Sequence, residues 1–213
     1  MQRKATNKRF NDYDAYLRHQ VRKVRADRQQ ARGGLSWEYG TQATVKPDLV
    51  RWVAEVQPPV ETAAVLVLGA RWGADVRFLR EAGYKHAIDA FDLYDPPLSP
   101  LVRVGDAHDL DACGAAENAY QLVWAYHVFE HFWDPSLVLH DLHRFVARGG
   151  HMFVAMPDFG VPDKYDAQDV FETRDEWEQL LSDTGWVVTK YDSYPIKGKR
   201  RPAHFYILEQ HGS

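Results

Sequence analysis

Short apolar runs alternate with segments of helical periodicity along most of the chain. An unbroken apolar run such as AAVLVL at 63–68 is typical of a strand that is buried on both faces of a sheet. The pattern predicts strands at 63–68, 87–93, 101–104, 120–126 and 151–156, and helices at 73–81, 137–146 and 174–182. Gly149-Gly150 is predicted to end the second of these helices, and Thr173 to cap the third.

Two further strands, at 186–191 and 204–209, follow the last helix with no helix between them. A parallel crossover needs about a dozen residues or more, so these two strands are predicted to form an antiparallel hairpin. The alternation of strands and helices before them favours a parallel sheet with helices on both faces. The predicted fold class is α/β, a Rossmann-like sheet that ends in an antiparallel hairpin.

The N-terminal part of the chain has helical periodicity and no predicted strand. Helices are expected at 12–32 and at 46–56, the second with Pro47 in its first turn. We therefore expect an N-terminal helical extension, residues 1–58, ahead of a main domain, residues 59–213.

Small and acidic residues follow the first three predicted strands. In a parallel sheet of this kind, ligands bind at the carboxyl ends of the strands. The first strand runs into the turn Gly69-Ala70-Arg71-Trp72-Gly73, where small residues let a ligand approach and the next helix offers free amides. Asp92 ends the second strand, where a carboxylate can accept both hydroxyls of a ribose, and Asp106 follows the third. These signals point to a nucleoside site, although an ordinary β–α turn with surface acids would also explain them.

The fourth strand runs into His127-Val128-Phe129-Glu130-His131. Here the sequence resembles the class I S-adenosylmethionine-dependent methyltransferases, in particular the small-molecule branch with an HVLEH-like segment. The resemblance covers about residues 60–210 and rests on the order of the segments LGARWGAD, AFDL, GDAHDL, YQLVWAYHVFEH, ARGG and EWEQLLSDTGW. It implies the strand order 3-2-1-4-5-7-6, S-adenosyl-L-methionine as cofactor, and methyl transfer as the activity.

The resemblance also assigns roles to residues. The glycine turn would cradle the methionine part of the cofactor, Asp92 would hold the ribose, and Asp106 with the Ala107 amide would face the adenine. Tyr126 and His127 would lie beside the sulfonium, where an aromatic ring is favourable for a cation. The cofactor-binding residues implied in this way are Gly69, Ala70, Arg71, Gly73, Asp75, Asp92, Leu93, Asp106, Ala107, Tyr126 and His127.

Two positions depart from the family pattern. The glycine turn usually reads acidic-x-Gly-x-Gly-x-Gly, whereas this chain has Val67 in the acidic position and Arg71 in place of the middle glycine. The missing acid removes a common contact to the methionine ammonium. Asp75 near the start of the next helix is a candidate replacement, or else it only complements the helix dipole.

Methyl transfer from a sulfonium is an in-line displacement in which the protein mostly supplies alignment. A general base is needed only when the acceptor must lose a proton. His127 and His131 are the candidate catalytic residues because histidine titrates near neutral pH, although packing alone would also explain His131. Trp37, Tyr39, Phe159 and Tyr165 either line an acceptor pocket or seal the edge of the sheet.

Two motifs point to other chemistries, and we favour neither. His127-x-x-Glu130-His131 fits the inverted zinc-protease pattern, but that motif requires a helix, so no metal site is expected. Asp95-Pro96-Pro97 is similar to the motif of enzymes that methylate exocyclic amines, but it follows the second strand instead of the fourth. We interpret it as a segment that stiffens a loop.

Charge is unevenly distributed. The net charge is −4, yet residues 1–32 alone carry +7, and Lys197, Lys199, Arg200 and Arg201 form a second basic cluster. Solvated surfaces explain both, although the N-terminal charge leaves an RNA-methylating variant open. Cys113 is the single cysteine, and no apolar run approaches the roughly 18 residues of a membrane helix. We therefore expect a cytoplasmic protein without a membrane partner, and the resemblance implies a small-molecule acceptor.

Two other function classes compete with this interpretation. A nicotinamide-dependent oxidoreductase is disfavoured by the missing G-x-G-x-x-G, by the closing hairpin and by the second acid at Asp106. A non-catalytic binding protein stays open because Val67 and Arg71 alter the glycine turn. The sequence does not identify the methyl acceptor or the oligomeric state.

Overall fold

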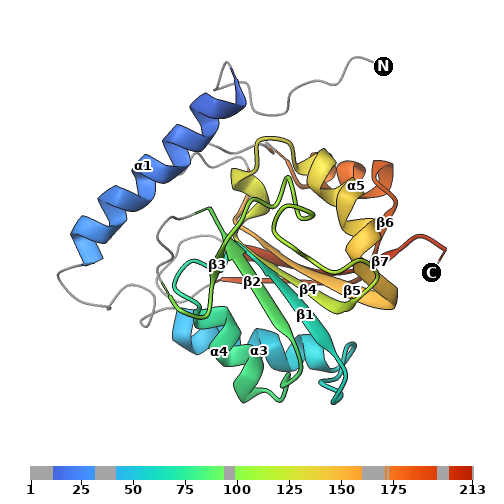
Figure 1. Ribbon diagram of the computed structural model, residues 1–213. Helices are drawn as coiled ribbons and strands as arrows, with labels where there is room; N and C mark the ends of the chain where they lie inside the picture. The colour runs from blue at the N-terminus through green and yellow to red at the C-terminus, as the bar shows by residue number, and fades with distance from the viewer. Residues whose placement is uncertain are drawn as a thin grey trace.

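One sheet organises the part of the chain that the computed structural model describes, namely residues 12–31, 42–93, 99–159, 171, 173–195 and 202–212. Its seven strands lie in the order β3-β2-β1-β4-β5-β7-β6 (Figure 1). They are β1 (Ala64–Leu68), β2 (Ile88–Asp92), β3 (Arg103–Val104), β4 (Tyr120–Tyr126), β5 (Val146–Met156), β6 (Trp186–Pro195) and β7 (Pro202–Gln210).

The directions of the strands confirm the predicted fold class and strand order. Strands β3, β2, β1, β4 and β5 pair in parallel, whereas β7 pairs antiparallel with both β5 and β6. Only residues 196–201 join β6 to β7, too few for a parallel crossover, so the last two strands form the expected hairpin.

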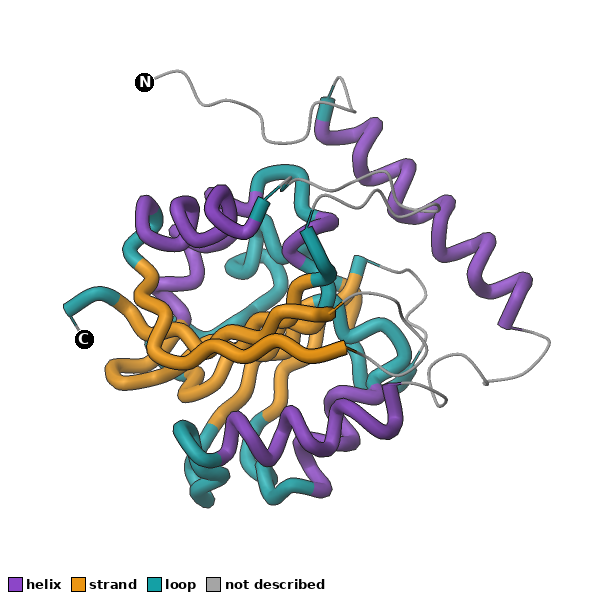
Figure 2. The backbone as a smooth tube through the Cα atoms, turned by 180° about the vertical axis from the view of Figure 1, so that it is seen from behind, coloured by secondary structure: helices purple, strands orange, loops and turns teal. Residues whose placement is uncertain are grey.

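Helices cover both faces of the sheet (Figure 2). Helices α3 and α4 lie on one face, α5 and α6 lie on the other, and α1 lies apart from both layers (Figure 1). The helices are α1 (Tyr13–Ala31), α3 (Gln42–Ala54), α4 (Ala74–Glu81), α5 (Pro135–Phe145) and α6 (Arg174–Asp183), with a short 3-10 turn, η1 (Phe129–His131).

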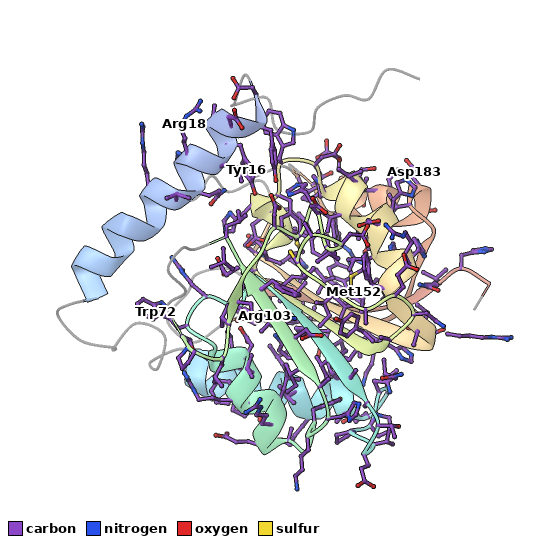
Figure 3. All side chains as sticks on the ribbon, viewed as in Figure 1. Tyr16, Arg18, Trp72, Arg103, Met152 and Asp183 are labelled. Atoms are coloured by element: carbon purple, nitrogen blue, oxygen red, sulfur yellow. The ribbon has the colours of Figure 1, made fainter. Side chains whose placement is uncertain are left out.

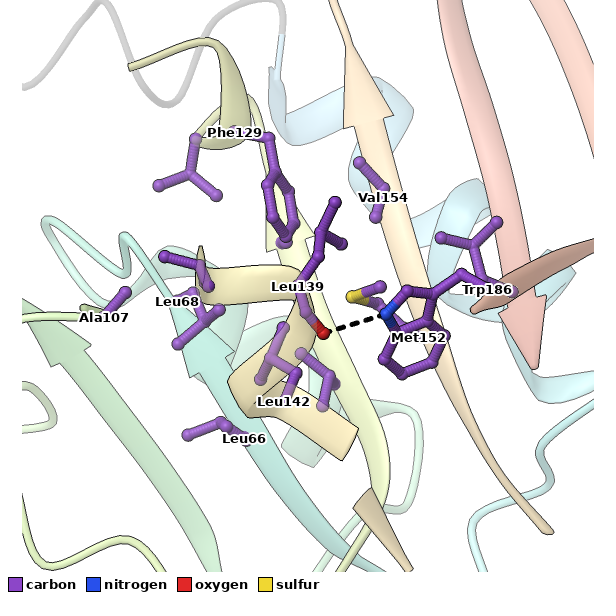
Figure 4. Packing of buried hydrophobic residues seen from close by; sticks show 14 of the residues in the cluster. Leu66, Leu68, Ala107, Phe129, Leu139, Leu142, Met152, Val154 and Trp186 are labelled. Atoms are coloured by element: carbon purple, nitrogen blue, oxygen red, sulfur yellow. Dashed lines mark hydrogen bonds between the residues drawn. The ribbon is translucent and has the colours of Figure 1, made fainter. Parts of the chain in front are cut away.

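Successive residues of β1 supply the two cores, because side chains alternate between the faces of a strand. Val65 and Val67 pack with Val53 of α3 in one buried cluster. Leu66 and Leu68 belong to the other cluster, with Leu139, Leu142 and Met152 (Figure 4). There the indole of Trp186 donates a hydrogen bond of 3.0 Å to the Leu139 carbonyl, which satisfies its only polar group inside the core (Figure 4).

Local signals explain where the helices begin. Thr173 caps α6 as predicted, and its hydroxyl accepts from the Glu176 amide at 3.2 Å while the Glu176 carboxylate accepts from the Thr173 amide at 3.3 Å. Asp134 caps α5 by accepting from the Leu137 amide at 3.0 Å, and Pro135 occupies the first turn.

Several predicted boundaries were wrong. The pair Gly149-Gly150 does not end a helix: α5 ends at Phe145, and both glycines lie inside β5. The pairing register shifts between Tyr120 and Leu122 of β4, so the glycines mark an irregular strand. Helix α3 begins at Gln42, which puts Pro47 inside it, and only the last two residues of the predicted strand at 101–104 are extended.

Helix α1 turns one side toward the sheet. Tyr16 lies on this side and is 1% exposed, whereas Arg18 points away from the sheet (Figure 3). Helix α3 contributes Leu49, Val50 and Val53 to the same core as β1, and the division of the chain at residue 58 stays a prediction. In the described ranges, no helix combines the length and the apolar character that crossing a bilayer requires.

Candidate functional site

The turn after β1 has the tight backbone that its glycines predict. Gly69 and Gly73 have positive φ angles of 66° and 72°, in the left-handed region that favours glycine. A Cβ atom on Gly69 would lie 2.6 Å from Cγ2 of Val128, and one on Gly73 would lie 2.8 Å from the Ser99 hydroxyl. Both positions therefore require glycine for space as well as for conformation.

Arg71 occupies the middle of this turn with a φ of 44°, which is strained for a residue with a side chain. Its backbone amide donates a hydrogen bond of 2.8 Å to Oδ2 of Asp92, at the end of β2. An arginine thus adopts a left-handed conformation in the middle of the turn, and its amide orients the Asp92 carboxylate.

Asp106 lies after β3, under the first turn of α1. Its carboxylate accepts from the His108 amide at 2.9 Å, lies 2.9 Å from His108 Nδ1, and accepts from the Tyr13 hydroxyl. Burial by itself would raise the pKa of Asp106, but the hydrogen bonds from His108 and Tyr13 outweigh it and hold that pKa below its usual value. Asp106 is therefore an ionised carboxylate held by its own neighbours.

The segment after β4 gathers three ionisable side chains. His127 has a φ of 52°, and its amide donates to the Ala155 carbonyl of β5 at 3.0 Å. Its Nδ1 lies 3.3 Å from Oε1 of Glu130, and His131 Nε2 lies 3.9 Å from the same oxygen. The Tyr126 ring stands edge-on to the His127 ring, with centroids 4.6 Å apart.

These segments meet in one pocket, together with α1. Its polar part is formed by the glycine turn and by acidic and histidine side chains, which come from the ends of four strands. Apolar side chains form its walls. The lining residues are Tyr16, Gln20, Leu68, Gly69, Arg71, Phe91, Asp92, Leu93, Gly105, Asp106, Ala107, His127, Val128, His131 and Phe132.

The structure therefore brings most of the predicted site residues together, and four lie outside the lining. Ala70 and Gly73 belong to the same turn but are not part of the wall, and Tyr126 stands behind His127. Asp75 is buried beneath the turn, where Oδ1 lies 2.7 Å from Lys46 Nζ and accepts from the Trp124 indole at 3.2 Å.

Asp75 lies close to Val67, the position at which the pattern that this chain resembles has an acidic residue. Val67 pairs in register with Trp124, whose indole donates to Asp75. Lys46 also lies 4.3 Å above the centre of the Tyr126 ring. The carboxylate nearest to this part of β1 and β4 is thus held in a buried ion pair with Lys46.

Sequence reasoning did not identify the individual residues that α1 and α3 contribute. Tyr13, Tyr16 and Gln20 come from a helix that sequence alone could not place against Asp106, about ninety residues away. Lys46 carried a weak signal, because it shares a helix face with the buried Leu49, Val50 and Val53.

The competing motifs can be examined where the structure describes them. His127 has left-handed backbone and residues 129–131 form a 3-10 turn, so the two histidines do not share one face of an α-helix. No group of three or more His, Cys, Asp or Glu side chains suited to a metal occurs among the described residues. Phe159 packs against His204, with ring centroids 4.8 Å apart. Asp95-Pro96-Pro97, Trp37, Tyr39 and Tyr165 lie outside the described residues.

Comparison with known proteins identifies methyltransferases, both by a family model and by solved structures. A family model described as a methyltransferase domain matches residues 39–191. No curated protein matches the chain in sequence.

Solved structures of methyltransferases share the fold at low sequence identity. One is the 1,6-didemethyltoxoflavin-N1-methyltransferase of Burkholderia thailandensis, with a TM-score of 0.66 and 16% identity over 92% of this chain and 90% of that one. A SAM-dependent methyltransferase of Leishmania major has a TM-score of 0.66 and 14% identity over 93% and 85% of the two chains. One from Mesorhizobium loti has a TM-score of 0.62 and 13% identity over 79% and 99%.

Proposed function

The chain belongs to the methyltransferase domain family, whose cofactor is S-adenosyl-L-methionine, and on that premise we propose that it methylates a small-molecule acceptor in the pocket beneath α1. One observation carries the proposal: the glycine turn, Asp92, Asp106 and His127 follow four neighbouring parallel strands and line a single pocket.

The residues of the pocket suit the parts of this cofactor. Asp92 and Asp106 lie at the ends of adjacent strands. The Asp92 carboxylate would accept from the ribose hydroxyls, and the Asp106 carboxylate would accept from the exocyclic amine of adenine. Leu93 and the Ala107 amide belong to the same two segments. The turn formed by Gly69, Ala70, Arg71 and Gly73 offers close backbone approach to the methionine end, with Asp75 beneath it.

The cofactor supplies an electrophilic methyl group on a sulfonium, and the chain positions it. His127 at the end of β4 would face that sulfonium, whereas Tyr126 stands behind it and its ring is in contact with Lys46. His127 and His131 line the pocket and are the candidate bases. The Tyr13 hydroxyl already bonds Asp106, so an adenine amine has to share or replace this contact.

A small acceptor is favoured by the pocket itself. The apolar side chains of Leu68, Phe91 and Phe132 wall it, and Tyr16 with Gln20 of α1 lies across it. The similar Burkholderia enzyme holds 1,6-didemethyltoxoflavin together with S-adenosylhomocysteine, which is a property of that enzyme. Its acceptor atom is not transferred to this chain, because 16% identity carries only the fold.

Isothermal titration tests the proposal. We expect saturable binding of S-adenosylmethionine and S-adenosylhomocysteine and none of NADH. Asp92→Ala should weaken binding by about 10- to 100-fold, the effect of losing hydrogen bonds to a charged group. Asp48→Ala, which removes an exposed carboxylate on α3, is the matched control and should bind like the wild type. If the wild-type protein does not bind S-adenosylmethionine, the proposal fails.

A further inference from the structure

Glu130 is a buried carboxylate behind the wall of the pocket, and its neighbours are two histidines that line that pocket. Its side chain is 7% exposed. Oε1 lies 3.3 Å from His127 Nδ1 and 3.9 Å from His131 Nε2. No Lys or Arg pairs with Glu130 within the described ranges, and its Oε2 has no hydrogen-bond partner there.

A buried carboxylate is costly unless its charge serves a partner. Burial alone would raise the pKa of Glu130, but the nearby imidazoles of His131 and His127 outweigh it and lower that pKa. The group is therefore ionised at neutral pH. A core position filled for packing alone would be occupied at lower cost by an apolar side chain.

A backbone hydrogen bond holds His127 where its side chain lies between Glu130 and the pocket. The amide bond to Ala155 fixes the chain where β4 ends, and the side chain lines the pocket with 23% exposure. Nδ1 faces Glu130, whereas Nε2 has no partner in the part of the chain that the structure describes. The other charged or titratable side chains on this pocket are His131 after β4, Arg71 after β1, Asp92 and Asp106 at the ends of β2 and β3, and Tyr16 of α1.

We propose that Glu130 is a positioning residue that fixes His127 as its Nδ1–H tautomer and leaves Nε2 as the base for an acceptor whose attacking atom carries a proton. The inference rests on the proposed function and adds the substrate class, hydroxyl or amine acceptors. A carboxylate that orients an imidazole in this way selects the tautomer and stabilises the imidazolium that forms.

The step balances as follows. The oxygen or nitrogen of the acceptor forms a bond to the methyl carbon while the carbon–sulfur bond breaks, and that bond's electron pair remains on sulfur in S-adenosylhomocysteine. The proton of the attacking atom passes to His127 Nε2, and the Glu130 carboxylate faces the resulting positive charge. The imidazolium then releases the proton to solvent. Acceptors without such a proton, such as thioethers, need no base.

Nitrogen NMR of the histidine rings tests the inference without a known acceptor. Protein labelled with ¹⁵N in its ten histidines is recorded at pH 8, and His127→Gln and His131→Gln assign the two signals. In the wild type we expect the neutral His127 ring to be almost entirely the Nδ1–H tautomer. In Glu130→Leu this form should fall to a minority, because the acceptor for Nδ1–H is gone.

Glu130→Gln separates orientation from packing. It keeps a carbonyl oxygen in place of the carboxylate and should retain the wild-type tautomer, whereas Glu117→Leu, on the exposed surface, should change nothing. A wild-type His127 in the Nε2–H form, or a tautomer unchanged in Glu130→Leu, would overturn the inference. If Glu130→Leu does not fold, the wild-type tautomer alone decides.

Titration with S-adenosylhomocysteine keeps this inference distinct from the proposed function. No binding by the wild type refutes the proposed function. Normal binding together with the wrong His127 tautomer refutes only the role of Glu130.

Discussion

At the scale of single residues, the site depends on backbone conformations that few side chains tolerate. Gly69, Arg71, Gly73 and His127 all have positive φ angles, and they lie at the ends of β1 and β4. Glycine adopts this conformation readily, but for Arg71 and His127 it costs on the order of 1–3 kcal/mol each and persists where the surroundings enforce it. Their concentration around one pocket fits a binding site better than a chance feature of two loops.

Gly69→Ala should be strongly destabilising. The new Cβ would add the left-handed strain of about 1 kcal/mol and a contact of 2.6 Å with Val128, for a total loss of about 2–4 kcal/mol. Gly114→Ala is the matched control, because Gly114 has a φ of 71° with nothing within 4 Å, so it should lose only the strain. Urea unfolding gives both values. Equal losses in the two variants would show that the close packing against Val128 is unimportant.

At the scale of elements, the N-terminal helices add side chains to the site that the ends of the strands form. Helix α1 brings Tyr13 to Asp106 and places Tyr16 and Gln20 across the pocket. Helix α3 brings Lys46 to Asp75 of α4 beneath the glycine turn. Both contacts join the N-terminal extension to the site, one by a hydrogen bond and the other by an ion pair, in addition to apolar packing.

The Lys46–Asp75 pair makes a clear energetic prediction. Asp75→Asn should destabilise the protein by about 3–5 kcal/mol, because Lys46 would remain buried and charged without its partner. The double variant Lys46→Met, Asp75→Leu should be much less destabilised, since it removes both charges and keeps the volume. Chemical denaturation measures all three proteins.

The exposed pair Arg51–Asp48 on the same helix provides the comparison. Its side chains are 72% and 63% exposed, and Asp48→Asn should cost less than about 1 kcal/mol. If Asp75→Asn proves as mild as Asp48→Asn, the interior pair does not have the importance assigned to it.

At the scale of the whole molecule, acid should destabilise the fold through its buried carboxylates. Asp106 has a pKa below its ordinary value of 3.8, because His108 and Tyr13 outweigh the effect of burial. A group of this kind stabilises the folded state fully above its unfolded pKa, and the contribution disappears as pH falls through the folded value. The free energy of unfolding should therefore drop as pH falls from about 5 toward 2.

Asp106→Asn isolates this effect. The variant should be less stable than the wild type at pH 7, and its stability should fall less steeply over the acid range. Urea titrations at several pH values measure the slope. Parallel slopes for the two proteins would contradict the prediction.

Much of this molecule was predictable from sequence because the relevant signals are local. The apolar runs predicted the strands, and the lack of room for a helix between 186–191 and 204–209 required the hairpin. Asp92, Asp106, the glycine turn and His127 were expected together because parallel strands end at one edge of a sheet.

Other features depend on packing that no local pattern encodes. A glycine pair is typical both of a helix end and of an irregular strand, and the prediction that Gly149-Gly150 ends a helix was wrong because the pairing of β5 with β4 places both glycines in a strand. Tyr13 has a role only because α1 lies at the carboxyl edge of the sheet, next to Asp106. Lys46 has one only because α3 packs on one face of the sheet, next to Asp75. The periodicity of a helix predicts that it buries a face, but not which surface receives it.

The Lys46–Asp75 pair also bears on how this chain can be divided. A cut at residue 58 would separate the lysine from the aspartate and leave the Asp75 carboxylate without its cation in the piece 59–213. We therefore expect a fragment that begins after Lys46 to be less stable than one that keeps α3 with the sheet.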